Sequence, residues 1–338
     1  MLSLKVKEGM IMSDALNHYL CGQETLKRLS DMNITFDINQ KVYDLGTQGP
    51  DIFFYYNVLL KNENSINYGS ILHQNKVDDF FYSAISKILS MDEGKERTLI
   101  LSYLLGLISH HALDVATHPF IFYRSGKYLK SDPSTKDLKY NHKKYEVFLD
   151  IAFYNHRYSK KACCFPISSI FSISLFDAKI IESFYKDLIQ DVFAIDIKNN
   201  SVVKSIKKAK MLTSMLSDPT GMKKLVFGFI EILSGSYGKF SNAFYPINSP
   251  SDENILNLTG KAWHHPSDIG KTYHSSYNEL FDQSVKDALD KFLLVLSLIE
   301  RNAPPNLESI KTLFKNLSYE TGLDCNLDNA IRYFDSVI

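Results

Sequence analysis

The sequence predicts an all-α fold, and three observations support this prediction. Apolar residues recur three and four positions apart in several long segments, which is the spacing of one helix face. Alternating apolar and polar residues, the pattern of a half-buried strand, are scarce. Hydrophobic residues occupy 45% of the 338 positions, enough for a sizeable core. We therefore expect a single large multi-helix domain, with a helical part over residues 1–240 and a C-terminal helical extension, residues 241–338, packed on it.

Helical periodicity places the expected elements in order along the chain. It predicts helices over residues 13–29, 75–91, 95–117, 137–154, 178–193, 222–233 and 281–299. The segment 95–117 is the most apolar, so we expect it to be central and buried. We expect Pro119 to end it, because the residue before a proline is pushed out of the helical region. Two connections, residues 45–75 and 242–271, are rich in Gly, Pro, Asn and Ser and should be irregular.

Composition limits the classes of function and the compartment. Lys plus Arg and Asp plus Glu both number 38, so the formal net charge is zero, which argues against nucleic acid as the main partner. The four cysteines show no CxxC spacing, so neither a disulfide framework nor a cysteine zinc site is indicated. The N-terminal residues lack the apolar core of a signal peptide, and the longest apolar run, residues 99–108, is too short to span a bilayer. We therefore expect a soluble, cytoplasmic protein.

The expected central helix carries three ionisable residues four positions apart, His110, Asp114 and His118. In a helix this spacing puts all three on one face, one turn after the next. Burying them without partners would cost roughly 1–3 kcal/mol per group. Imidazole and carboxylate are zinc ligands, so a bound divalent cation would remove this cost. His111 lies about 100° around the helix from His110 and should point elsewhere.

A second pair with the same spacing, His142 and Glu146, follows in the helix expected over residues 137–154. Alone, such a pair is usually a solvated contact. Two helices that each offer stacked His and acid side chains are, however, how a helical bundle builds a metal cluster. His18, Asp51 and His73 would each be unremarkable alone, as a helix histidine, a turn aspartate and a loop histidine just ahead of a helix.

In chain order, these candidate ligands resemble the pattern of the bacterial zinc-dependent phospholipases C, over residues 13 to about 156: His18, Asp51, His73, His110, Asp114, His118, His142 and Glu146. The resemblance implies an all-α domain with a cluster of three zinc ions between its helices. It places the first ion among Asp51, His73, His110 and Asp114. It places the second among His118, His142 and Glu146, and the third between His18 and Asp114.

The third ion of that family is also held by an N-terminal tryptophan that signal-peptide cleavage exposes. The only tryptophan of this chain is Trp263, so we expect either a two-ion site or a third ion held by His18. The secreted toxins of the family also carry a C-terminal β-sandwich that docks on membranes. The C-terminal half of this sequence has helical periodicity, so we expect no such module.

The resemblance also implies an activity, the hydrolysis of glycerophospholipid phosphodiester bonds by metal-activated water. Asp51 would be catalytic, orienting or deprotonating that water. The aromatic run that follows Asp51 would supply an apolar wall beside the lipid, with Phe53, Tyr55 and Tyr56 as candidates. The expected partners are a phospholipid substrate and, transiently, a membrane surface.

Two other functions fit the same residues. Single-strand nucleases use the same zinc cluster and hydrolyse the same kind of bond, although the neutral net charge favours lipid. A zinc-binding protein without turnover would need a fully closed cluster. The segment of Trp263, His264 and His265 could form a lid or a head-group contact, but a packed loop is the favoured interpretation.

Overall fold

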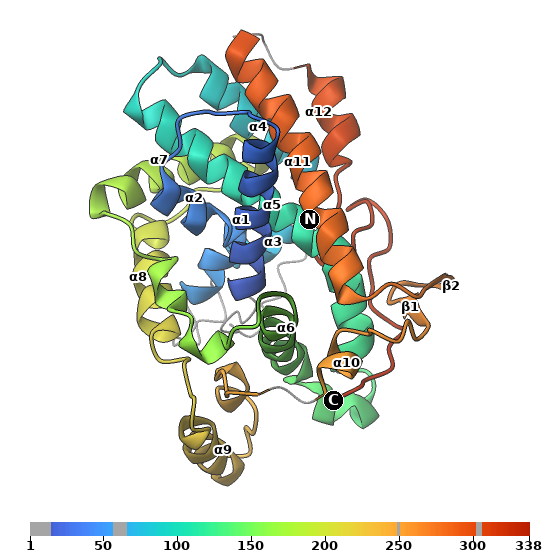
Figure 1. Ribbon diagram of the computed structural model, residues 1–338. Coiled ribbons are helices and arrows are strands. Elements are labelled where there is room, and N and C mark those ends of the chain that lie inside the picture. The colour runs from blue at the N-terminus through green and yellow to red at the C-terminus, as the bar shows by residue number, and fades with distance from the viewer. Residues whose placement is uncertain (1–14, 57–65, 249–250, 302–305) are drawn as a thin grey trace.

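A single long helix, α5 (Lys95–Ser125), forms the axis of the molecule. The computed structural model describes residues 15–56, 66–248, 251–301 and 306–338. The helices that pack most extensively on α5 are α1 (Ala15–Asp31), α2 (Gln40–Gly46) and α11 (Tyr277–Arg301). α6 (Asn141–Tyr158) contacts both α5 and α1, so these elements enclose the centre of the fold (Figure 1).

The central helix is longer than the sequence predicts. The prediction that Pro119 ends it is wrong, because α5 continues to Ser125 with Pro119 inside it. A proline within a helix leaves one carbonyl, here that of Val115, without its helical N–H. Gly322 comes close to this carbonyl, since a Cβ atom on Gly322 would lie 2.6 Å from the Val115 oxygen. The C-terminal segment around Gly322 therefore packs against α5 where proline interrupts the backbone hydrogen bonds of the helix.

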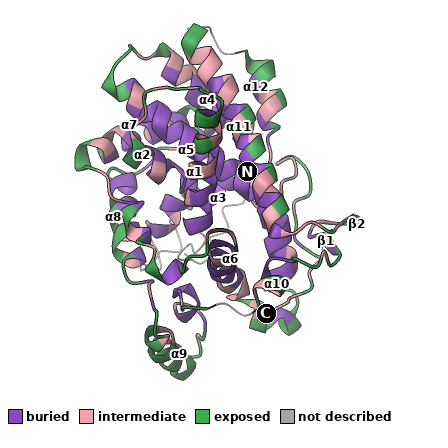
Figure 2. Ribbon diagram, viewed as in Figure 1, coloured by how far each residue is buried: buried purple, intermediate pink, exposed green. Residues whose placement is uncertain are grey.

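Burial identifies α5 as the core of the fold (Figure 2). Within the described part of the chain, α5 alone has the length and hydropathy of a membrane-spanning helix, and 89% of that apolar window is buried inside the structure. Its apolar side chains face the helices around it, as expected of a core helix. The prediction of a central, buried helix is confirmed.

The first connection expected to be irregular contains short helices. A 3₁₀ helix, η1 (Gly49–Tyr55), follows α2, and α3 (Tyr68–Gln74) begins where the Asn67 side chain accepts the N–H of Ser70. His73 thus lies in the last turn of α3, not in a loop as the sequence suggested. Residues 13 and 14, where the first helix was expected to begin, lie outside the described residues.

Some of the remaining helices correspond to predicted segments, and others were not predicted. The remaining helices are α4 (Val77–Ser90), α7 (Leu175–Phe193), α8 (Ser201–Thr213), α9 (Met222–Leu233), α10 (Asp252–Ile255) and α12 (Leu307–Phe314). The helix expected over residues 137–154 begins later, because a 3₁₀ turn, η2 (Pro133–Leu138), precedes α6. α9 spans the range that periodicity predicted, whereas α8 was not predicted.

The described strands form one small antiparallel hairpin, β1 (Trp263–His265) with β2 (Asp268–Tyr273). The described C-terminal region otherwise consists of helices and of the non-helical residues 315–338, which return to α5. The described residues therefore contain no β-sandwich, and the all-α prediction is confirmed.

Candidate metal centre

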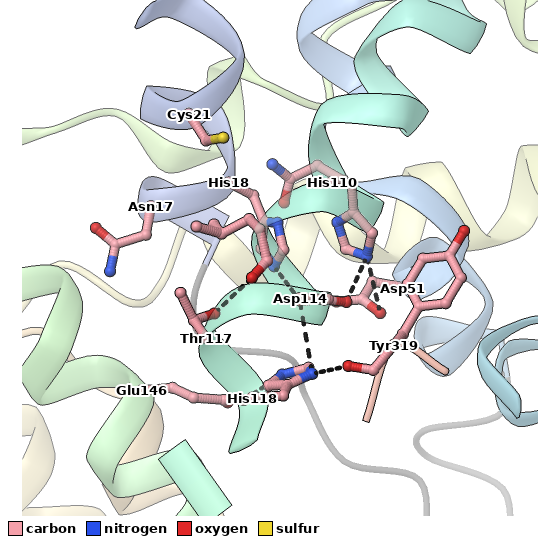
Figure 3. A network of polar contacts seen from close by, with 12 residues as sticks. Asn17, His18, Cys21, Asp51, His110, Asp114, Thr117, His118, Glu146 and Tyr319 are labelled. Atoms are coloured by element: carbon pink, nitrogen blue, oxygen red, sulfur yellow. Dashed lines mark hydrogen bonds and ion pairs between the residues drawn. The ribbon is translucent and has the colours of Figure 1, made fainter. Parts of the chain in front are cut away.

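Five elements bring the eight predicted ligands together. α1 supplies His18, η1 supplies Asp51, α3 supplies His73, and α6 supplies His142 and Glu146. The other three, His110, Asp114 and His118, lie along one face of α5, as their spacing predicted (Figure 3). Seven of the eight are buried, and the side chain of His142 is 16% exposed.

The first ligand group lies between η1, α3 and α5. His73 Nε2 is 2.9 Å from Asp51 Oδ1, and His110 Nε2 is 3.1 Å from Asp114 Oδ2. His110 Nε2 is also 3.9 Å from Asp51 Oδ1, and His73 Nε2 is 4.0 Å from Asp114 Oδ2. Four donor atoms from three elements thus surround a space that a metal ion could occupy.

The second ligand group joins α5 to α6. His142 Nε2 lies 2.7 Å from Glu146 Oε1, and His118 Nε2 lies 3.8 Å from the same oxygen. Donor atoms of these three residues fall within 4.8 Å of one another. The pair His142 and Glu146 is therefore part of the cluster and not a solvated helix contact.

Asp114 connects these groups. Its Oδ1 lies 3.2 Å from His18 Nε2 and 3.6 Å from His118 Nδ1, while its Oδ2 faces His110. The His18 ring stacks on that of His110, with centroids 4.0 Å apart. One carboxylate thus touches histidines from both ligand groups and from α1, which suits a bridging role.

The donor atoms themselves indicate a cation. Asp51 Oδ1, His73 Nε2, His110 Nε2 and both carboxylate oxygens of Asp114 are buried and have no hydrogen-bond partner outside the cluster among the described residues. Each such group costs roughly 1–3 kcal/mol when it is buried and left unsatisfied. A His and carboxylate set with no cysteine matches the donors that zinc takes in catalytic sites. The residues present therefore fit zinc.

The charges of the buried carboxylates also indicate a bound cation. Burial alone would raise the pKa of Asp114, but His118, His110 and His18 together hold that pKa well below its ordinary value. Burial would likewise raise the pKa of Glu146, and His142 and His118 lower it. Both carboxylates are thus held ionised in a buried site, where a divalent cation would balance their charge.

Backbone carbonyls orient three of the histidines. The Nδ1–H of His73 donates to the Gly69 carbonyl at 2.6 Å, and that of His110 donates to the Thr47 carbonyl at 3.0 Å. The Nδ1–H of His118 donates to the Tyr319 carbonyl at 2.6 Å. Because a carbonyl can only accept, each Nδ1 carries the proton and each Nε2 keeps its lone pair for a metal.

Tyr319 is the participant that sequence reasoning missed. It follows His118 by 201 residues, and its N–H also donates to the His73 carbonyl at 3.0 Å. Its buried ring lies 4.8 Å from the ring of His73. No side-chain motif marks a residue that acts through its backbone, so the sequence held no signal for it.

Asp150 of α6 fixes the start of α1. This buried carboxylate accepts the backbone N–H of Asn17 at 2.9 Å and that of Leu16 at 3.4 Å, and the Tyr245 hydroxyl also donates to it. An anion at a helix N-terminus is favourable because the first N–H groups have no helical acceptor. The contact holds α1 on α6 and so places His18 beside Asp114.

Gly49 allows η1 to approach His110 closely. Its φ of +47° is a left-handed conformation, and a Cβ atom there would lie 2.4 Å from the Cδ2 atom of His110. In Gly49→Ala we therefore expect the His110 ring or the η1 backbone to move and zinc affinity to fall about 10- to 100-fold, as it does when the groups that support metal ligands are lost. Competition with a chromophoric chelator measures this affinity.

Gly235→Ala is the matched control. Gly235 has a φ of +67°, but no atom lies within 4 Å of the position of its Cβ. Both alanines carry the strain of a left-handed backbone, about 1–2 kcal/mol, and only that at position 49 meets a ligand. Equal zinc affinity in the two variants would show that the close approach is unimportant.

Two predicted substrate residues do not face solvent. Phe53 and Tyr55 are buried, with Phe53 packed edge-on against Tyr185 and Tyr55 against Phe171. η1 turns these side chains into the core, so they cannot form a lipid wall. Tyr56 is partly exposed. Phe54, also partly exposed, lies with its ring 5.2 Å from the His73 ring.

The other singled-out aromatic and histidine residues support the fold. The His111 Nε2–H donates to the Leu317 carbonyl at 3.1 Å, away from the ligand groups, as expected. Trp263 is buried in β1 and donates its indole N–H to the Ser275 carbonyl. His265 is buried and bonds to the Thr321 carbonyl. The segment is packed, which was the favoured interpretation.

Comparison with known proteins agrees with this geometry. No curated protein and no solved structure was found to match the chain. The family model described as zinc dependent phospholipase C matches residues 17–207, which is more than half of the sequence and includes all eight predicted ligands. The chain therefore belongs to the zinc-dependent phospholipase C family.

Proposed function

We propose that this protein hydrolyses the phosphodiester bond of glycerophospholipids in the phospholipase C manner. Water adds to phosphorus and the bond to the glycerol oxygen breaks, so that a phosphorylated head group and diacylglycerol leave. The observation that carries the proposal is the pair of adjacent ligand groups joined by Asp114. Membership of the family supports the reaction class.

We assign the ligands as the resemblance implies. Asp51, His73, His110 and Asp114 would hold one zinc ion, and His118, His142 and Glu146 a second. His18 would hold a third with Asp114. When bound, neighbouring zinc ions offset charge on the phosphate oxygens and bring the pKa of water close to neutrality.

The side chains have separate tasks in this scheme. Asp51 Oδ1 lies between His73 and His110, where the carboxylate can orient the attacking water and accept its proton. The carbonyls of Thr47, Gly69 and Tyr319 keep the histidines in the ligating tautomer. Burial of the first group excludes bulk water, so the substrate would approach from His142, the most exposed ligand.

Elemental analysis of purified, untagged protein tests the metal assignment first. We expect two or three zinc ions per chain, because the donor atoms form overlapping groups of at least three. Zinc-dependent release of phosphocholine from a short-chain phosphatidylcholine then tests the reaction. Single-stranded DNA is the comparison substrate.

Three other results would contradict the proposal, each for a different reason. Faster hydrolysis of single-stranded DNA than of lipid would indicate a nuclease. Bound zinc without turnover of either substrate would indicate a structural or regulatory site. A folded chain that takes up no zinc from the buffer would remove the basis for hydrolysis altogether.

A further inference from the structure

α9 is a helix whose apolar side chains face solvent. Its described buried residues are Gly228 and Glu231. Most of its apolar side chains, in contrast, are exposed, among them Leu225 (66%), Phe229 (62%) and Leu233 (74%). Soluble monomers rarely leave contiguous apolar patches uncovered unless something binds there.

The exposed side chains form one broad apolar arc on α9: Met222, Leu225, Val226, Phe229, Ile230, Ile232 and Leu233. At 100° per residue they span about 160° of the helix circumference. Glu231 lies opposite this apolar arc. The helix stands at one end of the molecule, away from α5, with its surface exposed (Figures 1 and 2).

Two buried carboxylates hold α9 in this orientation. Asp218 accepts the backbone N–H groups of Lys223 and Lys224 at the start of the helix. Glu231 accepts the N–H of Gly238 at 2.9 Å and the hydroxyl of Ser241 at 2.6 Å. The one acidic residue of α9 is thus turned inward. The exposure of the apolar arc follows from defined contacts and not from a loose helix end.

The chain segment that contains α9 is positively charged. Residues 204–240 contain seven lysines and two acids, Asp218 and Glu231, in a chain whose formal net charge is zero. Both acids are buried. The solvent-facing charge of this segment therefore comes from lysine, which complements the negative surface of membranes that contain anionic lipid.

α9 is joined to the part of the structure that carries His142 of the metal centre. The loop that follows it reaches the start of α6, where Lys143 Nζ donates to the Lys239 carbonyl at 3.4 Å. Asn242 Nδ2 donates to the Tyr140 carbonyl, also at 3.4 Å. His142, the most exposed ligand, stands between Tyr140 and Lys143 in sequence. A surface to which α9 binds would therefore lie close to His142, the most exposed of the predicted ligands.

We infer that α9 is an interfacial helix that inserts its apolar arc into a phospholipid bilayer at the level of the head groups. The flat face of another protein would cover only part of an apolar arc this wide. Lipid is fluid and can cover the whole arc. The lysines of residues 204–240 add attraction to anionic lipid. The inference deepens the proposed function, on which it rests for its link to the lipid substrate.

Vesicle co-sedimentation of the zinc-loaded protein tests this inference. The vesicles are phosphatidylcholine alone and phosphatidylcholine with phosphatidylglycerol, and we expect tighter binding to the second. Phe229→Ser combined with Leu233→Ser should weaken binding to both about tenfold or more, since two large apolar side chains leave the bilayer. Both residues are exposed, so the variant should fold.

Phe176→Ser is the matched control. Phe176 is 72% exposed on α7, away from α9, and its replacement should leave vesicle binding unchanged. Wild-type protein that fails to sediment with either vesicle, or a double variant that binds as well as wild type, would overturn the inference. So would a wild-type dimer that the double variant separates into monomers while vesicle binding persists, because the apolar arc would then cover a second copy.

Activity separates this inference from the proposed function. The double variant should hydrolyse a monomeric short-chain lipid at the wild-type rate and vesicle lipid more slowly. An equal loss on both substrates would contradict a docking role for α9. If wild-type protein hydrolyses neither substrate but still binds vesicles through α9, the proposed function fails and the interfacial helix stands.

Discussion

Replacing Asp114 by alanine should remove zinc from the cluster and abolish hydrolysis. Asp114 contacts His18, His110 and His118 through its two oxygens, so its loss removes contacts to histidines of both α1 and α5. Its loss also leaves these histidines without the carboxylate that attracts a cation. We expect activity to fall on the order of a thousandfold or more, because the first and third metal positions lose their shared ligand. Zinc content and phosphocholine release measure the two effects.

Two further variants make this result interpretable. Asp114→Asn keeps the volume of the side chain and should also lose zinc, because a neutral amide is a weaker ligand and its NH₂ cannot bind a cation. Asp191→Ala removes an exposed carboxylate from α7 and should change neither zinc content nor rate. Full zinc and full activity in Asp114→Ala would refute the assignment of the cluster.

Removing zinc with a chelator should lower the thermal unfolding midpoint on the order of 10 °C. Tightly bound ions add about 4 kcal/mol each when free zinc is a thousandfold above its dissociation constant. For a chain of this size, each kcal/mol shifts the midpoint by roughly 2 °C. Without the ions, buried histidines and carboxylates from five elements face one another uncompensated. Differential scanning calorimetry with and without the chelator measures the shift.

Restoring zinc should restore the midpoint, and magnesium should not, because histidine-rich sites favour zinc over harder cations. Asp114→Ala provides the second control, since its midpoint should no longer respond to zinc. A wild-type midpoint that is the same with and without zinc would show that the cluster is not loaded in the folded protein.

The clustering of the candidate ligands was predictable because of where they sit in the sequence. Burying three ionisable groups at four-residue spacing in an otherwise apolar helix costs free energy unless they have partners, so a bound cation was the simplest explanation. The structure puts His110, Asp114 and His118 on one face of α5 and brings His142 and Glu146 to them. The helical character of the fold followed from periodicity in the same way.

Other features depend on contacts that periodicity does not encode. Pro119 remains inside α5 because surrounding packing outweighs the loss of one helical hydrogen bond. Phe53 and Tyr55 point into the core because η1 turns them there. The sequence predicted α9, but a helical pattern cannot say whether the apolar residues of a helix meet the core or solvent.

Because His118 is held by the carbonyl of Tyr319, the metal centre can be completed only after the C-terminal part of the chain has been made. His118 emerges from the ribosome 201 residues before the residue that fixes its tautomer. Until that later segment is made, the His118 ring has no carbonyl at Tyr319 to hold it, even though every predicted ligand already exists. Maturation of the site would therefore be a late event, and a nascent chain would carry the ligands without the finished centre. A protease cut between α12 and Tyr319 would return the protein to that immature condition.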